Sequence, residues 1–417
     1  MNDNLKDSFG DIEYVAVCPG CKNDILTVLE PANEHRIFLT SADEMIITIG
    51  VCSCEQCGLT FLNPRMGQQK LFEYYSKQSR IPRKSIEIGS PFALLIEMQI
   101  NLIEKIRPLE KGMKVLEIGC AEGFFLQNLN KRANNQLSLF GVELSEKYIE
   151  QVKKLLPNVT LFETTLEVTE FGDLKFDLIV MRHVLEHLSN PLECLKKIRN
   201  ILAPNGVMYI EVPDSQDIAP SLSRFYHHEH LLYFTNQILN SYLRSSGFSP
   251  LICERFNANP VGSGFAYSVL RAVSVAGQSM ELDSFPGYAK QVYLENKIRN
   301  DACFHSLFAS ICQRLRRLKK SQKIIGLFGA GPHTMDVLEL LAKENIPWSK
   351  IFDNNPNKHG KFMCGIPIVK PDENTLKSVD CLLVSSAEFE NEMVAQIRFL
   401  VGMQVEVITI YGNSSSN

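Results

Sequence analysis

Short runs of apolar residues alternate with segments of helical periodicity through the middle of the chain. Residues 137–142, 176–181 and 207–212 are apolar runs of the length expected for buried strands. Residues 91–107 carry apolar side chains at helical spacing, and Pro108 ends the predicted helix. This alternation predicts a parallel sheet covered on both faces, with a ligand at the carboxyl ends of its strands.

The same alternation returns in the last third of the chain. A helix is predicted over residues 288–320, and its basic end is expected to be a solvated helix C-terminus. A strand and glycine turn over residues 323–334 precede a helix at 335–344, with further strand ends near residues 351–355 and 380–386. The sequence therefore predicts an α/β protein in which a second, smaller Rossmann-like domain follows the first.

A glycine turn follows the first core strand at residues 115–125, which read VLEIGCAEGFF. Glycines at a strand-to-helix turn let the backbone approach a nucleotide-like ligand closely. A carboxylate stands about 20 residues further on, where such folds hold ribose hydroxyls. An NAD-binding domain stays open as an alternative, although the strand end HVLEHL and the turn at residues 203–206 argue against it. The residues predicted to bind the cofactor are Glu117, Gly119, Cys120, Ala121, Gly123, Glu143 and Leu144.

Two Cys-x-x-Cys pairs lie in the N-terminal part of the chain. Cys18 and Cys21 enclose Pro-Gly, and Cys54 and Cys57 precede a glycine. Four thiolates on tight turns are what a tetrahedral zinc ion needs, and a closed set of four sulfurs makes that ion structural. Cys52 is an alternative ligand outside this spacing. The competing interpretation is two unrelated cysteine pairs in an apolar interior.

Composition and charge argue against several classes of partner. The 417 residues carry 43 Lys and Arg against 47 Asp and Glu, so neither nucleic acid nor an anionic membrane is expected to bind. No apolar run approaches the ~18 residues that span a bilayer, and the N-terminus does not have the pattern of a signal peptide. A cytoplasmic location is expected, in which the 12 Cys are thiols or metal ligands.

A cluster of ionisable side chains follows the last core strand. Residues 225–234 read FYHHEHLLYF. Three interpretations are open: a second metal site, a structural cluster that caps a loop by hydrogen bonding, or a general base. The spacing disfavours a metal site, because adjacent histidines point in different directions. The candidate catalytic residues are Tyr226, His228, Glu229 and His230.

In their order, these segments resemble the class I S-adenosylmethionine-dependent methyltransferases, whose glycine loop has the form E/D-x-G-x-G-x-G. Ala121 stands here in place of the middle glycine. The resemblance implies S-adenosylmethionine as the cofactor and places His183 beside the methyl donor's pocket. Glu186 and His187 are expected to begin the next helix and to cap it.

Over nearly the whole chain, the sequence resembles the sugar C-methyltransferases. This resemblance rests on the second Cys-x-x-Cys pair, which continues as CGLTFLNPR, on the motif His228-Glu229-His230 and on the C-terminal glycine turn. It implies three units: a zinc ribbon-like domain, a class I methyltransferase core and a Rossmann-like C-terminal domain with its leading helix. We place these units at residues 1–80, 81–275 and 276–417.

What the resemblance implies about activity is methyl transfer to a carbon atom of a nucleotide-linked keto-deoxysugar. His230 would remove the proton, with Glu229 or Tyr226 orienting it, and the C-terminal domain would help to hold the nucleotide. The chain departs from the family at His227, where the family has Tyr, and in the turn GLFGAGPHT, which lacks the family's Lys.

Three further points stay open at the level of sequence. Tyr74 or Tyr75 is a candidate to reach the substrate, although paired aromatics more often pack. A glycine turn at residues 259–264 is expected to lead into a closing strand, and the tail 412–417 is predicted to be disordered. The alternative functions are an O-methyltransferase for a glycan precursor or another small molecule, and a non-catalytic protein that binds a sugar nucleotide.

Overall fold

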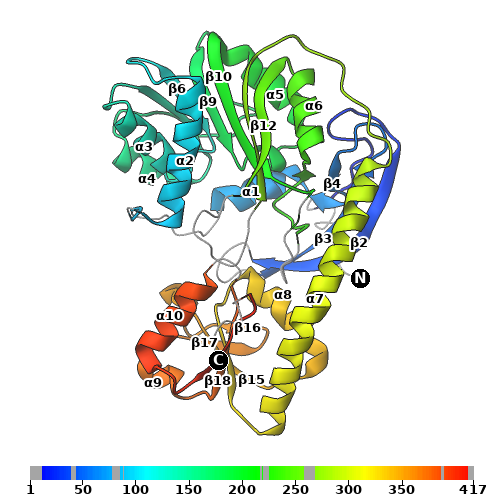
Figure 1. Cartoon of the computed structure of the whole chain (residues 1–417), viewed down its shortest axis with the longest axis vertical. Helices are drawn as coiled ribbons and strands as arrows, with labels where there is room; N and C mark the ends of the chain where they lie inside the picture. The colour runs from blue at the N-terminus through cyan, green and yellow to red at the C-terminus, as the bar shows by residue number, and fades with distance from the viewer. Residues whose placement is uncertain are drawn as a thin grey trace, which may run out of the picture.

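The computed structural model describes residues 12–38, 44–77, 85–87, 89–216, 218, 225–257, 268–386 and 389–411. These residues form an upper and a lower lobe, which the long helix α7 (Tyr288–Lys320) joins along one side (Figure 1). The predicted glycine turn at 259–264 and the tail 412–417 lie outside the described residues. Within the described part of the chain, no helix is long and apolar enough to cross a membrane.

The upper lobe is built on a seven-stranded sheet of order β12-β13-β10-β9-β6-β7-β8. Five neighbouring strands, from β10 to β8, run parallel, and β13 and β12 add an antiparallel edge. The strands are β6 (Lys114–Ile118), β7 (Ser138–Val142), β8 (Thr160–Phe162), β9 (Phe176–Arg182), β10 (Leu202–Pro213), β12 (Phe248–Asn257) and β13 (Ser268–Ala276). The helices are α2 (Pro91–Ile106), α3 (Phe124–Arg132), α4 (Glu146–Leu155), η3 (Leu185–His187), α5 (Pro191–Ile201) and α6 (Asn236–Ser245).

Side chains of this sheet alternate between two hydrophobic cores, as the period of two residues in a strand requires. On β9, Leu178 and Val180 belong to the core that includes α2 and α3, whereas Ile179 and Met181 belong to the opposite core. The opposite core continues into the N-terminal unit and includes Phe61. The N-terminal unit is therefore fixed to the upper lobe by shared burial of apolar surface.

The N-terminal unit is a four-stranded sheet of order β11-β4-β3-β2. Its last strand, β11, comes from a distant part of the chain, directly after the histidine-rich segment, and places Leu232 opposite Phe61. The N-terminal sheet thus holds one end of that segment. The elements of this unit are β1 (Ile12–Glu13), β2 (Leu26–Phe38), β3 (Glu44–Cys54), β4 (Thr60–Leu62), β5 (Arg65–Met66), α1 (Gln68–Lys77) and β11 (Leu232–Tyr233).

The lower lobe is a six-stranded sheet of order β16-β17-β15-β14-β18-β19, parallel except for β16. The basic end of α7 packs on it, because Arg316 pairs with Glu344 and Arg314 pairs with Glu406, both at 2.6 Å. The strands are β14 (Ile325–Phe328), β15 (Trp348–Phe352), β16 (Phe362–Met363), β17 (Ile366–Val369), β18 (Cys381–Val384) and β19 (Glu406–Ile408). The helices are α8 (Pro332–Leu340), η4 (Ala342–Glu344), η5 (Pro356–Lys358), α9 (Glu373–Leu376) and α10 (Glu390–Val401).

This arrangement confirms the predicted α/β fold class, and two local expectations differ from it. Residues 203–206, predicted as a turn, are part of β10, whose register against β9 shifts between Leu202 and Val207. Glu186 and His187 do not begin α5, because they close the short 3₁₀ helix η3 and α5 begins only at Pro191. The register shift accommodates the Pro-Asn-Gly sequence, which a regular strand would exclude.

Candidate functional site

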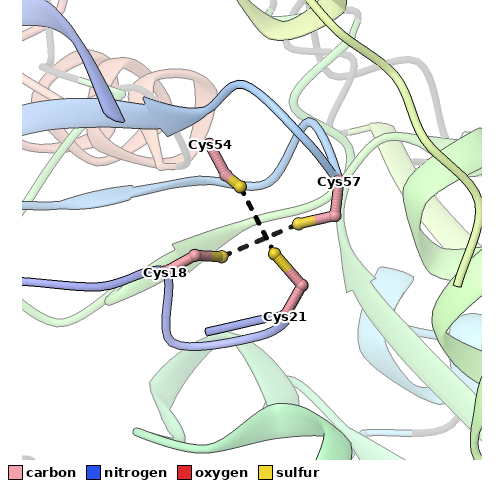
Figure 2. Close-up of side chains that lie close together, drawn as sticks. All are labelled: Cys18, Cys21, Cys54 and Cys57. Atoms are coloured by element: carbon pink, nitrogen blue, oxygen red, sulfur yellow. Dashed lines mark hydrogen bonds between the residues drawn. The ribbon is translucent and has the colours of Figure 1, made fainter. Parts of the chain in front are cut away.

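Four cysteines of the N-terminal unit meet in one cluster (Figure 2). The sulfurs of Cys18 and Cys57 lie 3.6 Å apart, and those of Cys21 and Cys54 lie 3.4 Å apart. A disulfide requires about 2.05 Å, so these are free thiols. Sulfurs around a tetrahedral zinc ion, with bonds of about 2.3 Å, lie about 3.8 Å apart. The four cysteines predicted from the sequence therefore fit a structural zinc ion.

The cysteine cluster packs directly against the upper lobe. The hydroxyl of Tyr242, a fully buried residue of α6, lies 3.2 Å from the sulfur of Cys57. A side chain at Gly20 would meet that hydroxyl at 1.8 Å, so the knuckle requires glycine there. The alternative ligand Cys52 lies apart, with its sulfur 3.8 Å from the carbonyl oxygen of Asn63. Sequence spacing carries no signal for Tyr242, which is 185 residues from Cys57.

The glycine loop after β6 lies beside Glu143, because β6 and β7 end together with Ile118 opposite Val142. The carboxylate of Glu143 accepts hydrogen bonds from the backbone N–H groups of Ala121, Leu144 and Ser145, at 2.8 to 2.9 Å. Burial raises the pKa of Glu143, and these donors oppose the rise. A carboxylate offers about four acceptor positions, so one position remains for a ligand hydroxyl.

The backbone of the loop is left-handed at Gly119 (φ 69°), Ala121 (φ 44°) and Gly123 (φ 80°). At Gly119 a Cβ atom would meet Cγ2 of Val184 at 2.5 Å. Ala121 keeps the conformation that the motif's usual glycine adopts without cost. Cys120 is buried between them and packs against Gly141, where a Cβ atom would meet the Cys120 sulfur at 2.8 Å.

Glu117 lies on β6, directly before the glycine loop, and fixes the end of that strand through an ion pair. Its buried carboxylate pairs with Arg182 at 2.7 Å, and the guanidinium group lies 4.4 Å from the ring centroid of Phe125. Arg182 also donates to Gln99 at 3.1 Å, and Gln99 donates to Glu211 at 2.7 Å. This network ties the ends of β6, β9 and β10 together. Sequence reasoning found Glu117 but missed the rest of the network, whose members lie on α2, α3, β9 and β10.

The histidine cluster is assembled from the N-terminal unit, the end of β9 and the segment before β11. The carboxylate of Glu229 accepts a hydrogen bond from the hydroxyl of Tyr74. The backbone carbonyl of Glu229 lies 2.6 Å from Nδ1 of His187 and accepts from the hydroxyl of Tyr75 at 3.1 Å. The ring centroids of His187 and His230 lie 5.0 Å apart. Both tyrosines of α1 therefore reach this cluster, beyond the packing role that the sequence favours.

The other predicted residues of the segment surround these contacts. The ring of His228 lies edge-on to Tyr74 with centroids 5.1 Å apart, and His227 stacks near His230 at 4.0 Å. Tyr226 packs against Tyr233 at 4.7 Å, and burial raises the pKa of its hydroxyl well above the ordinary value. Tyr226 is therefore a protonated, largely packed side chain.

Two histidines of the site have opposite charge preferences. Burial lowers the pKa of His230 well below its ordinary value, and the four neighbouring histidines lower it further. Burial also disfavours the charged form of His183, but the contact with Glu186 at 3.4 Å outweighs it and the pKa is raised. His183 adopts a φ of 53°, which is uncommon for a residue with a side chain. A neutral His230 can accept a proton at a pH at which His183 is a cation.

The lower lobe contains a second glycine loop, after β14. Gly329 has a φ of 104°, and the N–H of Ala330 donates to Asp353 at 2.7 Å. Nζ of Lys358 donates to the carbonyl oxygen of Ala330 at 2.7 Å and to Asp353 at 3.2 Å. Although the turn itself lacks a lysine, Lys358 brings a cation to it from a later position in the sequence.

Comparison with known families agrees with this geometry. Residues 97–252 match a methyltransferase domain family, and residues 320–408 match a family described as C2185-like, N-terminal. The first match includes the glycine loop, Glu143 and the histidine cluster. The chain thus contains a class I, S-adenosylmethionine-dependent methyltransferase domain.

Individual relatives share this domain. A tRNA U34 carboxymethyltransferase of Campylobacter lari is 26% identical over 162 residues, 36% of this chain and 55% of that protein. A ubiquinone biosynthesis O-methyltransferase of Actinobacillus pleuropneumoniae is 26% identical over 128 residues, 28% of this chain and 53% of that protein. This chain therefore spans only about half the length of these curated relatives. The crystal structure of the N-methyltransferase NodS from Bradyrhizobium japonicum covers 46% of this chain and 100% of its own, at 16% identity and a TM-score of 0.36.

Proposed function

We propose that the protein transfers the methyl group of S-adenosylmethionine to a carbon atom of a nucleotide-linked keto-deoxysugar. The observation that carries this proposal is the cluster around His230: its ring lies 5.0 Å from that of His187, and the tyrosines of α1 bind its neighbours, Tyr74 to Glu229 and Tyr75 to His187. A neutral imidazole has the free lone pair that removal of a proton from a carbon atom next to a ketone requires.

The residues of the glycine loop would bind the cofactor. Glu143 would accept hydrogen bonds from the ribose hydroxyls, while the left-handed backbone at Gly119 and Ala121 would allow close approach of the nucleoside. Cys120, Gly123 and Leu144 complete this proposed set. S-adenosylmethionine supplies a methyl group on a sulfonium ion, which is electrophilic without further activation.

The chain's own residues would prepare the acceptor. His230 takes the proton, and the electron pair of the C–H bond becomes the enolate, whose carbon then takes the methyl group while the C–S electron pair stays on sulfur. Tyr74 and Glu229 hold the loop that carries His230, and His228 packs against that support.

A zinc ion at the four cysteines would support this geometry without taking part in the chemistry. The cluster borders β3 and β4, and β4 pairs with β11, which follows His230 by one residue. Zinc binding would therefore fix the position of the histidine segment. A reducing compartment such as the cytoplasm would keep the thiols available for the metal.

Metal analysis tests the zinc assignment. Replacing Cys54 by Ser should reduce bound zinc from one equivalent to none, measured by native mass spectrometry of the purified chain. Cys52→Ser is the matched control, because Cys52 lies outside the cluster, and it should retain the zinc. Zinc loss in both variants, or in neither, would contradict the assignment.

The lower lobe would hold the nucleotide end of the acceptor. Its glycine loop carries the paired charges of Asp353 and Lys358, and a lysine beside such a loop suits a phosphate. We accordingly keep residues 1–80, 81–275 and 276–417 as the proposed zinc-binding, methyltransferase and acceptor-binding units.

The central residue of the mechanism can be tested by substitution. His230→Asn should lower methyl transfer by at least about 100-fold, because a general base contributes 10²–10⁴-fold, and should leave S-adenosylmethionine binding unchanged. His35→Asn, on the hairpin of the N-terminal unit, is the control and should retain full activity. Wild-type turnover by the His230 variant would exclude His230 as the base.

An oxygen acceptor is the second candidate. The similarity to a ubiquinone biosynthesis O-methyltransferase over 128 residues favours it. A hydroxyl group also needs a base, so the two candidates differ in the methylated atom of the product and not in the role of His230.

A further inference from the structure

Glu186 is a buried carboxylate between two histidine rings. Its side chain is 1% exposed, and Oε1 lies 3.4 Å from Nδ1 of His183 and 3.8 Å from Nε2 of His187. Among the described residues, neither oxygen of Glu186 has a hydrogen-bond partner. A carboxylate taken out of water without hydrogen bonds is costly unless a cation lies close to it. The carboxylate therefore lies within reach of two imidazole rings, of which His183 can supply a positive charge.

The orientation of His187 favours a metal ion beside that carboxylate. Its Nδ1 lies 2.6 Å from the backbone carbonyl of Glu229 and 2.7 Å from the hydroxyl of Tyr75. A carbonyl can only accept and a hydroxyl can accept as well, so both contacts are satisfied when Nδ1 carries the hydrogen. The lone pair is then on Nε2, the nitrogen that faces Glu186. A histidine held by Nδ1–H to a carbonyl oxygen is the usual arrangement of a metal ligand.

We propose that Glu186, His187 and His230 form a second metal site, which takes a divalent transition-metal ion. One ligand atom from each residue lies within 4.8 Å of the others. Ligands at about 2.1 Å from a tetrahedral ion lie about 3.4 Å apart, so small ring rotations bring these atoms into place. Two imidazoles and a carboxylate suit Zn²⁺ or Co²⁺ better than Mg²⁺ or Ca²⁺.

The ligands come from two segments, which explains why the sequence argues against a metal there. Spacing within residues 225–234 offers no complete ligand set, and the set becomes visible only when the end of β9 is brought against that segment. The sites for zinc in the N-terminal unit and for this ion are built from different residues and different donor atoms. Loading of one is therefore distinguishable from loading of the other.

The consequence for catalysis rests on the proposed function. A lone pair of His230 that binds a metal ion is not available to accept a proton. The metal-bound form is therefore inactive in carbon methylation, and the ion acts as a reversible inhibitor of the base.

Titration of the full-length, zinc-containing protein with Co²⁺ tests the site. Co²⁺ bound to nitrogen and oxygen ligands absorbs in the visible range, whereas Co²⁺ that displaces zinc from thiolates adds sulfur-to-cobalt bands in the near ultraviolet. One equivalent of Co²⁺ should bind and should give the visible bands without the sulfur-to-cobalt bands. Glu186→Gln and His187→Asn should each weaken binding at least tenfold, and His35→Asn should not change it; thermal unfolding checks that all variants are folded.

Each result decides between the inference and its alternatives. Absence of the visible bands, or equal affinity in Glu186→Gln and the wild type, would overturn the metal site and leave the methyltransferase proposal intact. Cobalt binding by a protein whose cobalt-free form methylates no sugar would uphold the site and count against the proposed function. Faster carbon methylation in the cobalt-loaded protein would overturn the inhibitory role.

Discussion

The two glycine loops of this protein lie in similar strand-turn-helix arrangements, but the charged groups beside them differ. In the upper lobe the N–H of Ala121 donates to Glu143, and in the lower lobe the N–H of Ala330 donates to Asp353. Asp353 also pairs with Lys358 at 3.2 Å, whereas Glu143 accepts from backbone amides. The first carboxylate is held by backbone amides, and the second pairs with a lysine of its own unit.

The difference teaches that a similar strand-turn-helix frame can serve two kinds of ligand. A carboxylate with one acceptor position left and no lysine paired to it suits the ribose hydroxyls of S-adenosylmethionine, which is itself a cation, and a loop that carries a lysine suits an anionic nucleotide. Affinity for the methyl donor should therefore depend on the upper loop alone. Differences between the two lobes are expected in stability as well as in binding, and they follow from the largest effect to the smallest.

The largest effect is expected for acidification, which should destabilise the lower lobe. His333, at the start of α8, lies between Ser385 at 2.9 Å and Tyr411 at 2.8 Å, and burial lowers its pKa from 6.5 to about 4. Because the unfolded chain binds this proton more readily, the stabilisation is complete above pH 6.5 and is lost as the pH falls toward 4. The loss is about 3 kcal/mol.

Urea unfolding between pH 7.5 and 4.5, followed by tryptophan fluorescence, measures this loss. Trp348 is the chain's single tryptophan and lies on β15, so the signal reports on the lower lobe. His333→Gln should flatten the pH dependence in this range. An unchanged slope in that variant would show that other groups cause the acid sensitivity.

The second effect concerns the carboxylate of Glu143. Glu143→Ala should weaken S-adenosylmethionine binding by about 2 kcal/mol, or roughly 30-fold, because hydrogen bonds to a charged acceptor are lost. Asp353→Ala removes the corresponding carboxylate in the lower lobe and should leave that affinity unchanged. Isothermal titration calorimetry gives both values, and equal losses would contradict the separation of the two loops.

The third effect concerns the turns themselves. Gly119→Ala should destabilise the protein by about 1–3 kcal/mol, because the φ of 69° is strained for alanine and its Cβ atom meets Val184 at 2.5 Å. Gly331→Ala is the control in the lower lobe, where φ is −114° and nothing lies within 4 Å. Thermal unfolding should separate them, and similar melting temperatures would refute the strain argument.

The smallest effect is expected at Lys358. Lys358→Met should weaken binding of a nucleoside diphosphate sugar by about 1 kcal/mol, or roughly fivefold, because one partly exposed cation is removed. Binding of S-adenosylmethionine should stay the same in this variant. A loss confined to the methyl donor would reverse the assignment of the two loops.

The elements that sequence reasoning predicted are those that local patterns determine. Apolar runs predicted β6, β7 and β9 within a residue or two, and helical spacing predicted α2 and the bounds of α7. The pairing of β11 with β4 was not predicted, because two short strands far apart in the chain carry no local signal of their contact.

The candidate site also has parts that local sequence predicts and parts that depend on tertiary contacts. A few neighbouring residues of sequence are enough to identify each Cys-x-x-Cys pair, the glycine loop and the motif His228-Glu229-His230. Their partners could not be, since Tyr242 reaches Cys57, and Glu186 approaches His230, only after the units fold together. Spacing finds groups on one turn or strand, whereas the charge and orientation of a group depend on tertiary contacts.

The most direct test of the central claim is the fate of a labelled methyl group. The protein is incubated with S-adenosylmethionine carrying a ¹³C methyl group and a panel of nucleotide-linked 4-keto-6-deoxysugars, and products are examined by mass spectrometry and carbon NMR. The account predicts a labelled methyl group on a ring carbon, lost in His230→Asn. A label on oxygen, or a labelled product from the His230 variant at the wild-type rate, would contradict it.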